Sequence, residues 1–209
     1  MNPNLKLAFL LLSALVPLPA VRGADTNSPA PATRPGDAEA QADTFARYAM
    51  PGPEHKVLEV MAGDWETVAR YWPAPKAEPV EAKGTSHRKW ILEGRFLMEE
   101  LDGGNLVLPF SGLALYGYDA FEQKYTSAWV DTLNTSILTN LGDYDRTNNV
   151  VNFNGQYKDP WTGARKKERG VMRFVSKDKQ VLEIHVTEAG GKEFEMLEVV
   201  YTRRAVGKT

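Results

Sequence analysis

Hydrophobic and polar residues alternate in short runs over most of the chain beyond residue 63. In the run Val181–Thr187, every second residue is a large aliphatic one and the residues between them are polar. Successive side chains of a β-strand point to opposite faces, so this pattern predicts a strand with one apolar and one polar face. Similar runs, rich in β-branched and aromatic residues, recur at intervals of about 8–12 residues, which is typical of an all-β sandwich or barrel.

The alternation predicts about ten strands. They cover Asp64–Trp72, Thr85–Leu92, Arg95–Leu101, Phe110–Tyr118, Tyr125–Asp131, Thr135–Leu141, Val150–Tyr157, Arg165–Phe174, Val181–Thr187 and Lys192–Arg203. Short turns such as Asp102–Gly104 and Ala189–Gly191 favour an antiparallel up-and-down order. A sheet of this kind avoids exposed edges by closing on itself. In the last strand the apolar positions change phase between Met196 and Leu197, which predicts a β-bulge.

The first fifty residues differ in composition from the rest of the chain and lack this alternation. Lys6 precedes the apolar run Leu7–Val16 and then small residues, which predicts a secretory signal peptide over residues 1–23. A cut after Ala20 is the alternative to one before Ala24. The apolar run is too short for a membrane anchor, which needs about 20 residues, so we expect no stable membrane span after cleavage. The mature protein is then expected to be exported, either periplasmic or secreted.

Residues 24–50 are rich in Ala and Pro and poor in large apolar side chains, which predicts a disordered spacer. A short helix is expected over Pro53–Met61, where an N-terminal proline precedes apolar residues at helical spacing and Gly63 supplies a stop. The folded domain is expected over residues 51–205.

Composition narrows the possible functions. The chain has no cysteine, which excludes disulfides, thiolate metal sites and a cysteine nucleophile. Its net charge of -2 argues against nucleic acid as a partner, because phosphate binding needs a cationic surface. The three histidines show no metal-binding spacing, and we expect neither a metal nor another cofactor, haem included. The oligomeric state is left open.

Two short sequence features resemble the calycins. Gly63 and Trp65 form a G-x-W at the start of the first strand, and Arg203 and Arg204 end the last one. In the resemblance, the tryptophan plugs one end of the barrel and an arginine stacks across it. Such a cation–π contact is worth roughly 0.5–2 kcal/mol. The resemblance therefore implies structural roles for Gly63, Trp65 and Arg203, or Arg204 in place of Arg203.

A longer set of phrases, spread from about His55 to Arg203, resembles the DUF1579 family, which is assigned to the calycin-like barrels. They include the segments 61–65, 91–96, 110–112, 115–119, 129–131, 159–163 and 196–201. The implied fold is a calycin-like, lipocalin-like barrel with one short N-terminal helix. The family name records an unknown function, so the resemblance implies no reaction.

The first candidate ligand site is an aromatic cluster on two neighbouring strands. Tyr118, Tyr125, Trp129 and Asp131 could line one wall of a pocket, because a small-ligand cavity combines aromatic walls with a few polar groups. The structural alternative is that Trp129 belongs to the core and that Tyr118 and Asp119 shape a turn.

Further candidates are polar. Arg95 and Glu99 share one face of a strand, Asn154 lies on a polar face, and His185 lies beside Glu183. Each could approach a ligand, or could equally face water. The basic run Arg165–Arg169 is interpreted as a charged edge or exposed strand rather than as an anion site.

Three functions therefore remain open. The first is a binding protein that holds a small amphipathic or apolar molecule inside the barrel. The second is an enzyme in which Asp131, Glu99 or His185 acts as acid or base on a substrate in the barrel; this predicts a desolvated carboxyl group beside a cavity, with a raised pKa. The third is a non-catalytic structural or envelope protein, which predicts an undersized cavity and an exposed apolar patch. No catalytic residue is assigned.

Overall fold

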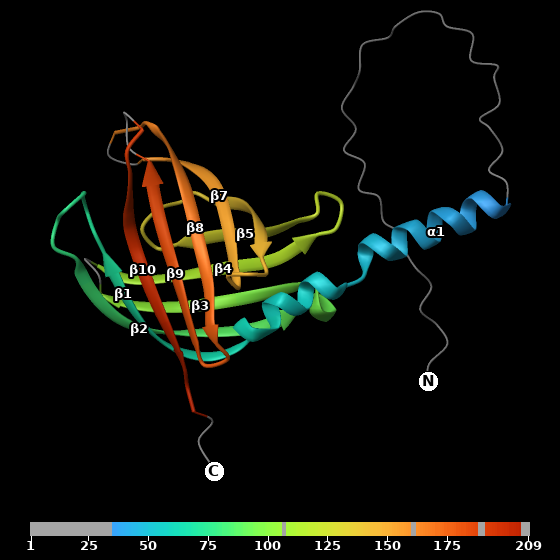
Figure 1. Cartoon of the computed structure of the whole chain (residues 1–209), viewed down its shortest axis with the longest axis horizontal. Coiled ribbons are helices and arrows are strands. Elements are labelled where there is room, and N and C mark those ends of the chain that lie inside the picture. Colours follow the sequence, from blue (N-terminus) through green and yellow to red (C-terminus); the bar gives the residue numbers. More distant parts are fainter. Residues whose placement is uncertain (1–34, 106–107, 160–161, 188–190, 206–209) are drawn as a thin grey trace, which may run out of the picture. The chain divides into compact units, whose positions relative to one another are not determined.

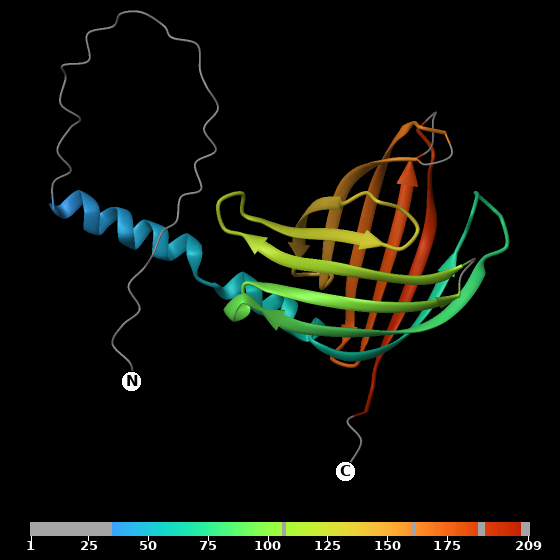
Figure 2. The same cartoon turned by 180° about the vertical axis from the view of Figure 1, so that it is seen from behind.

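A closed antiparallel barrel forms the body of the molecule. The computed structural model describes residues 35–105, 108–159, 162–187 and 191–205. Each strand pairs with the next along the chain, and the last pairs with the first (Figures 1 and 2). The strands are β1 (Gly63–Tyr71), β2 (Val80–Ile91), β3 (Phe96–Asn105), β4 (Pro109–Asp119), β5 (Lys124–Asp131), β6 (Leu138–Asp145), β7 (Val150–Lys158), β8 (Arg165–Ser176), β9 (Lys179–Thr187) and β10 (Glu193–Arg203). The predicted all-β class and up-and-down order are confirmed.

The strand faces follow the alternation in the sequence. On β9, Val186 is buried and Leu182 and Ile184 line the barrel interior, whereas Glu183 and His185 lie on the opposite face. The predicted bulge in β10 is also confirmed, because its register with β9 shifts between Glu195 and Leu197. The shift brings Met196 and Leu197 to the interior together.

One predicted turn is wrong. β3 continues through Asp102 to Asn105, and its register with β4 shifts between Asp102 and Gly104. Gly104 has a φ of 66°, a left-handed conformation that glycine adopts without steric cost. The two glycines therefore form a bulge inside a longer strand. The turn expected at Ala189–Gly191 lies mostly outside the described residues.

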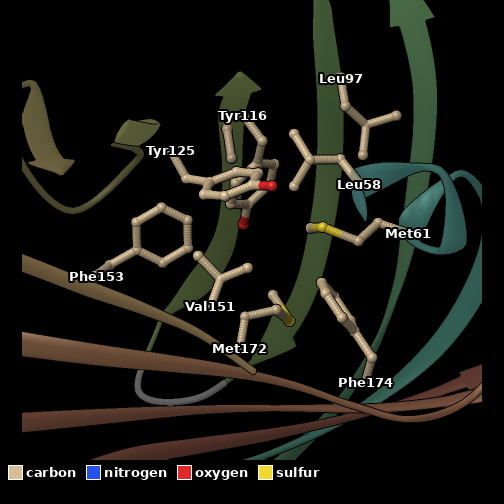
Figure 3. Packing of buried hydrophobic residues seen from close by; sticks show 10 residues of the cluster. Leu58, Met61, Leu97, Tyr116, Tyr125, Val151, Phe153, Met172 and Phe174 are labelled. Atoms are coloured by element: carbon tan, nitrogen blue, oxygen red, sulfur yellow. The ribbon is translucent and has the colours of Figure 1, made fainter. Parts of the chain in front are cut away.

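A short helix, η1 (Pro53–Met61), packs its apolar side against the barrel core. It has the predicted bounds, but it is a 3₁₀ helix. Leu58 and Met61 are each 1% exposed and belong to a cluster with Leu97, Met172 and other interior residues. Figure 3 shows both side chains pointing from η1 into this cluster. The helix thus fills one end of the barrel interior.

Trp65 and an arginine complete this closed end. The indole is fully buried and its Nε1 donates to the Met61 carbonyl at 2.8 Å. The Arg203 guanidinium lies 4.1 Å from the ring centre and donates to the carbonyls of Val60 and Ala62. Of the two arginines considered for this contact, Arg203 makes it. Gly63 is needed beside them, because its φ is 115° and a Cβ there would lie 2.6 Å from Arg203 Nη1.

The helix α1 (Pro35–Ala49) differs from the expectation of a disordered spacer. The chain divides into two units between Ala40 and Gln41, a point that lies within α1. The segment contains several alanines, which have the highest helix propensity, and the expectation had weighed only its low hydrophobicity. Near its end Tyr48 stacks on Phe121, with ring centres 4.1 Å apart.

Candidate ligand cavity

The barrel interior contains a cavity of about 280 Å³. Apart from Leu133, which follows β5, its lining residues come from β1 and from β3 through β10, and most are apolar, including Ala114, Phe153, Leu182 and Val199. At ~30 Å³ of liquid volume per water, the space equals roughly nine waters. Ligand pockets usually measure about 300–1,000 Å³, so this cavity lies just below the lower end of that range and suits only a small molecule.

A row of polar residues crosses the cavity wall. Strand register places Ser127, Asn140, Gly155 and Glu168 side by side on β5, β6, β7 and β8, and we call the three that line the cavity, Ser127, Asn140 and Glu168, the polar row. The Asn140 amide nitrogen lies 3.5 Å from Ser127 Oγ and 3.3 Å from Glu168 Oε1. Gly155 makes this reach possible, because a Cβ there would collide with the Asn140 amide. The missing side chain therefore lets Asn140 span from β6 to β8.

Glu168 is the acidic member of the polar row and it lines the cavity. Burial raises the pKa of its carboxyl group, and the hydrogen bond from Asn140 only partly opposes that shift. The chemical result is a desolvated carboxyl group facing an apolar space.

Trp129 and Asp131 also line the cavity. Trp129 Nε1 donates to Asp131 Oδ2 at 2.8 Å, and the ring lies against Gly112, where a Cβ would collide with it. Asp131 Oδ1 accepts from the Leu133 backbone N–H and the Asn134 side chain. Asp131 therefore orients the indole and organises the chain after β5.

A third carboxylate, Glu99, is buried at the closed end, on β3 opposite Arg88 of β2. Its side chain is 1% exposed and its Oε1 lies 3.0 Å from Arg88 Nη2, an ion-pair contact without hydrogen-bond geometry. Ser86 Oγ and Tyr116 Oη donate to the two carboxylate oxygens at 2.6 and 3.0 Å. Burial and the Glu99 charge raise the pKa of Tyr116 well above its usual range, so it stays a donor. Arg88 also donates to Gln180.

A family model described as "Protein of unknown function (DUF1579)" matches residues 50–203. The chain belongs to the DUF1579 family. Comparison of the sequence with curated proteins gave no match.

The DUF1579 barrel is also similar to solved structures. One is an S-type phycobiliprotein lyase, CPES, from Guillardia theta, with a TM-score of 0.47 and 11% identity over 78% of this chain and 98% of that chain. Another is a redesigned β-barrel, with a TM-score of 0.28 and 11% identity over 71% of this chain and 96% of that one. The fold of this DUF1579 member is the closed antiparallel barrel described above.

Two candidate residues of the DUF1579 chain lie at the closed end instead of the cavity. Tyr125 Oη donates to the Glu54 carboxylate at 2.9 Å, and burial together with this contact raises the pKa of the phenol. The Tyr118 ring packs against Tyr125 and His55, at 5.1 and 6.1 Å between centres. Both tyrosines thus pack near η1, and the structure does not bring them to Trp129 and Asp131.

Three other candidates lie away from the cavity lining. Arg95 donates to the Ala49 carbonyl at 2.8 Å and pairs with Glu93. Asn154 is exposed on β7. His185 Nε2 lies 3.7 Å from Glu183 on the outer face of β9. Their ligand-binding roles remain predictions that this placement does not favour.

Sequence reasoning missed Glu168 because it falls within the basic run of β8. One of the two expectations for that strand, a sheet edge, is wrong, because β8 pairs with both β7 and β9. Arg169 binds Glu193 at 2.8 Å, so the cation is paired on the surface. The signal for Glu168 was its spacing from Gly170, Met172 and Phe174, which share the inner face of β8.

Two tests concern metals and membranes. Within the four described ranges, His, Asp and Glu side chains do not gather in threes as a metal site would require. None of the helices in the described part of the chain is both long and apolar enough to cross a membrane.

Proposed function

We propose that this DUF1579 member binds a small, mainly apolar molecule inside its barrel. The observation that carries the proposal is the 280 Å³ cavity, whose walls are mostly apolar and include the polar row on one side. Such a combination gives a ligand apolar contact area and fixes its orientation through few polar groups. The structural alternative had predicted an undersized cavity, and a space of roughly nine water volumes favours binding instead.

One observation favours a second candidate function, an enzyme that acts on a molecule held in the cavity. Glu168 has a raised pKa because of burial, which is the property expected of a general acid. The earlier candidates fit less well, since Glu99 is saturated by Arg88, Ser86 and Tyr116. The contact of Glu168 is the Asn140 amide, which cannot relay a proton. Binding is therefore the first choice.

Native mass spectrometry of the protein purified from an exporting host tests the binding proposal. We expect a reproducible extra mass under native conditions that is lost on denaturation. Val199→Phe should abolish it by filling the cavity, whereas Val200→Phe, at the next position along β10, should retain it. Ala69→Leu, which fills the cavity from β1, serves if Val199→Phe misfolds.

Loss of the extra mass in both valine variants, with both folded by circular dichroism, would contradict a cavity ligand. A bare wild-type protein that also takes up no added small amphiphile would contradict the binding function itself.

We also propose that the protein is exported. The support is the build of residues 1–23, which lie outside the described part of the structure. Expression of the full chain in a bacterial host should give an exported protein whose measured mass is that of a chain starting at Ala24, or at Val21. Leu11→Arg interrupts the apolar run and should retain the uncut chain in the cytoplasm. An exported chain that still begins at Met1 would contradict cleavage.

A further inference from the structure

The charged groups of the cavity all have one sign. Two carboxyl groups, on Asp131 and Glu168, line it, and its lining contains no Lys, Arg or His within the described residues. The nearest part of the closed end does hold a cation, Arg88, but that guanidinium lies 4.0 Å from the centre of the Tyr201 ring and pairs with Glu99. Tyr201 itself lines the cavity. The charge that reaches a ligand is therefore negative.

The two carboxyl groups differ in how many of their hydrogen-bond acceptor positions are already occupied. Asp131 already accepts from the Trp129 indole, the Leu133 backbone and the Asn134 side chain. Glu168 has one long contact, from the Asn140 amide at 3.3 Å. A carboxylate has about four acceptor positions, so Glu168 retains room for a donor that a ligand would bring.

The other members of the polar row point to the same kind of ligand group. Ser127 Oγ and the Asn140 side-chain carbonyl can accept hydrogen bonds beside Glu168, although the serine hydroxyl can also donate one. An ammonium group has three donors and no acceptor, so it matches these acceptors and the carboxylate. The ring of Trp129 also lines the cavity, and aromatic faces attract cations. A ligand carboxylate or phosphate would instead meet Glu168 at short range in an apolar space, where like charges repel strongly.

From this arrangement we propose that the ligand is an apolar molecule ending in a protonated amine, with the ammonium group at Glu168 and the apolar part along the aliphatic wall. This rests on the binding function proposed above and names its ligand class. Anionic amphiphiles such as fatty acids are then expected to bind more weakly, because the same carboxylate repels them.

Three probes of equal chain length and about the volume of the cavity test the charge preference: octylamine, octan-1-ol and octanoate. Their affinities are measured by isothermal titration calorimetry at pH 7.5, where an alkylamine is protonated because its pKa resembles that of lysine, about 10.4. For the wild-type protein we expect octylammonium to bind at least tenfold more tightly than octan-1-ol, and octanoate to bind most weakly.

Glu168→Gln keeps the shape and removes the charge. It should abolish the tenfold preference for the amine and leave the affinity for octan-1-ol within about twofold, which also shows that the variant is folded. The matched control is Glu183→Gln, the same change on the outer face of neighbouring β9, and it should keep the wild-type order.

The outcomes separate the two proposals. Binding of octan-1-ol without a preference for the amine, or a preference that survives Glu168→Gln, would overturn the ligand class and leave the binding function standing. Tighter binding of octanoate would overturn it as well. If none of the three probes binds and native mass spectrometry shows no ligand, the binding function itself fails.

Discussion

Two regions inside the barrel each contain a glutamate on an inward-facing strand position, and the two glutamates differ in how many partners surround the carboxyl group. At the closed end, Glu99 has three partners, the Arg88 guanidinium, Ser86 and Tyr116, and is 1% exposed. In the polar row, Glu168 faces the cavity with the Asn140 amide as its contact. A buried charge is costly unless it is paired and hydrogen-bonded. The comparison therefore teaches that Glu99 belongs to the framework, and that Glu168 is placed where a ligand can supply the missing partner.

The largest expected effect comes from breaking the framework pair. Glu99→Gln leaves the Arg88 charge buried without a counter-ion, and breaking such a pair typically costs about 3–5 kcal/mol. Urea denaturation measures the loss in the free energy of unfolding. The control is Glu100→Gln, whose side chain is 51% exposed, and it should change stability by less than about 0.5 kcal/mol. Equal effects of the two changes would show that Glu99 is no framework residue.

Removing the arginine that closes the barrel should cost somewhat less. Arg203→Ala removes the contact with Trp65 and the donors to the Val60 and Ala62 carbonyls, a loss of about 2–3 kcal/mol. Arg204→Ala removes a half-exposed side chain and should stay within about 0.5 kcal/mol. Thermal and urea unfolding compare the two. A smaller loss for Arg203 than for Arg204 would argue against the closing role of the Trp65 contact.

A smaller effect is expected in the polar row. Gly155→Ala forces the Asn140 amide off Glu168 and should cost about 1–2 kcal/mol through crowding. NMR should show the Asn140 side-chain amide signals moving. At Gly52 an added Cβ meets open space, so Gly52→Ala should leave those signals in place. Unchanged Asn140 signals in Gly155→Ala would contradict the bridge between β6 and β8.

The smallest effect, and one of opposite sign, is expected for Glu168→Gln. Burial raises the pKa of Glu168 in the folded protein, so the folded state holds its proton more tightly than the unfolded state does. Its charge therefore lowers stability as the pH rises from the unfolded pKa through the folded one. The variant should melt slightly above the wild type at pH 7.5, and the difference should vanish towards pH 4. A variant less stable than the wild type at pH 7.5 would place Glu168 in the framework.

Local patterns sufficed for much of the fold. Alternation located all ten strands, and the phase change between Met196 and Leu197 located the β10 bulge, because both depend only on which way successive side chains point. Asp102–Gly104 was mistaken for a turn because glycines serve turns and bulges equally. The helix α1 was missed because its residues were judged by hydrophobicity alone.

The cavity was harder to predict, because its members come from strands far apart in the sequence. Trp129 and Asp131 were found as an aromatic and acidic pair on one face of β5. Tyr118 and Tyr125 also lie on the inner faces of β4 and β5, but at the end of the barrel beside η1. The order of the strands does not show how far along the barrel axis a residue lies. Glu168 and Arg88 were missed because each lies in a stretch of charged residues, and charged residues are usually exposed. Their positions on the inner face of the strand, every second residue, were the signal that they are buried.

The most direct test of the cavity is the pKa of Glu168, measured by carboxyl-carbon NMR with and without octylammonium. In the free protein the pKa should lie above that of an ordinary glutamate, about 4.3, because the group is desolvated by burial beside the apolar cavity wall. Saturation with octylammonium should lower it, since the bound cation stabilises the carboxylate. An ordinary pKa that does not respond to the amine would contradict the account of Glu168 as the polar anchor of a ligand cavity.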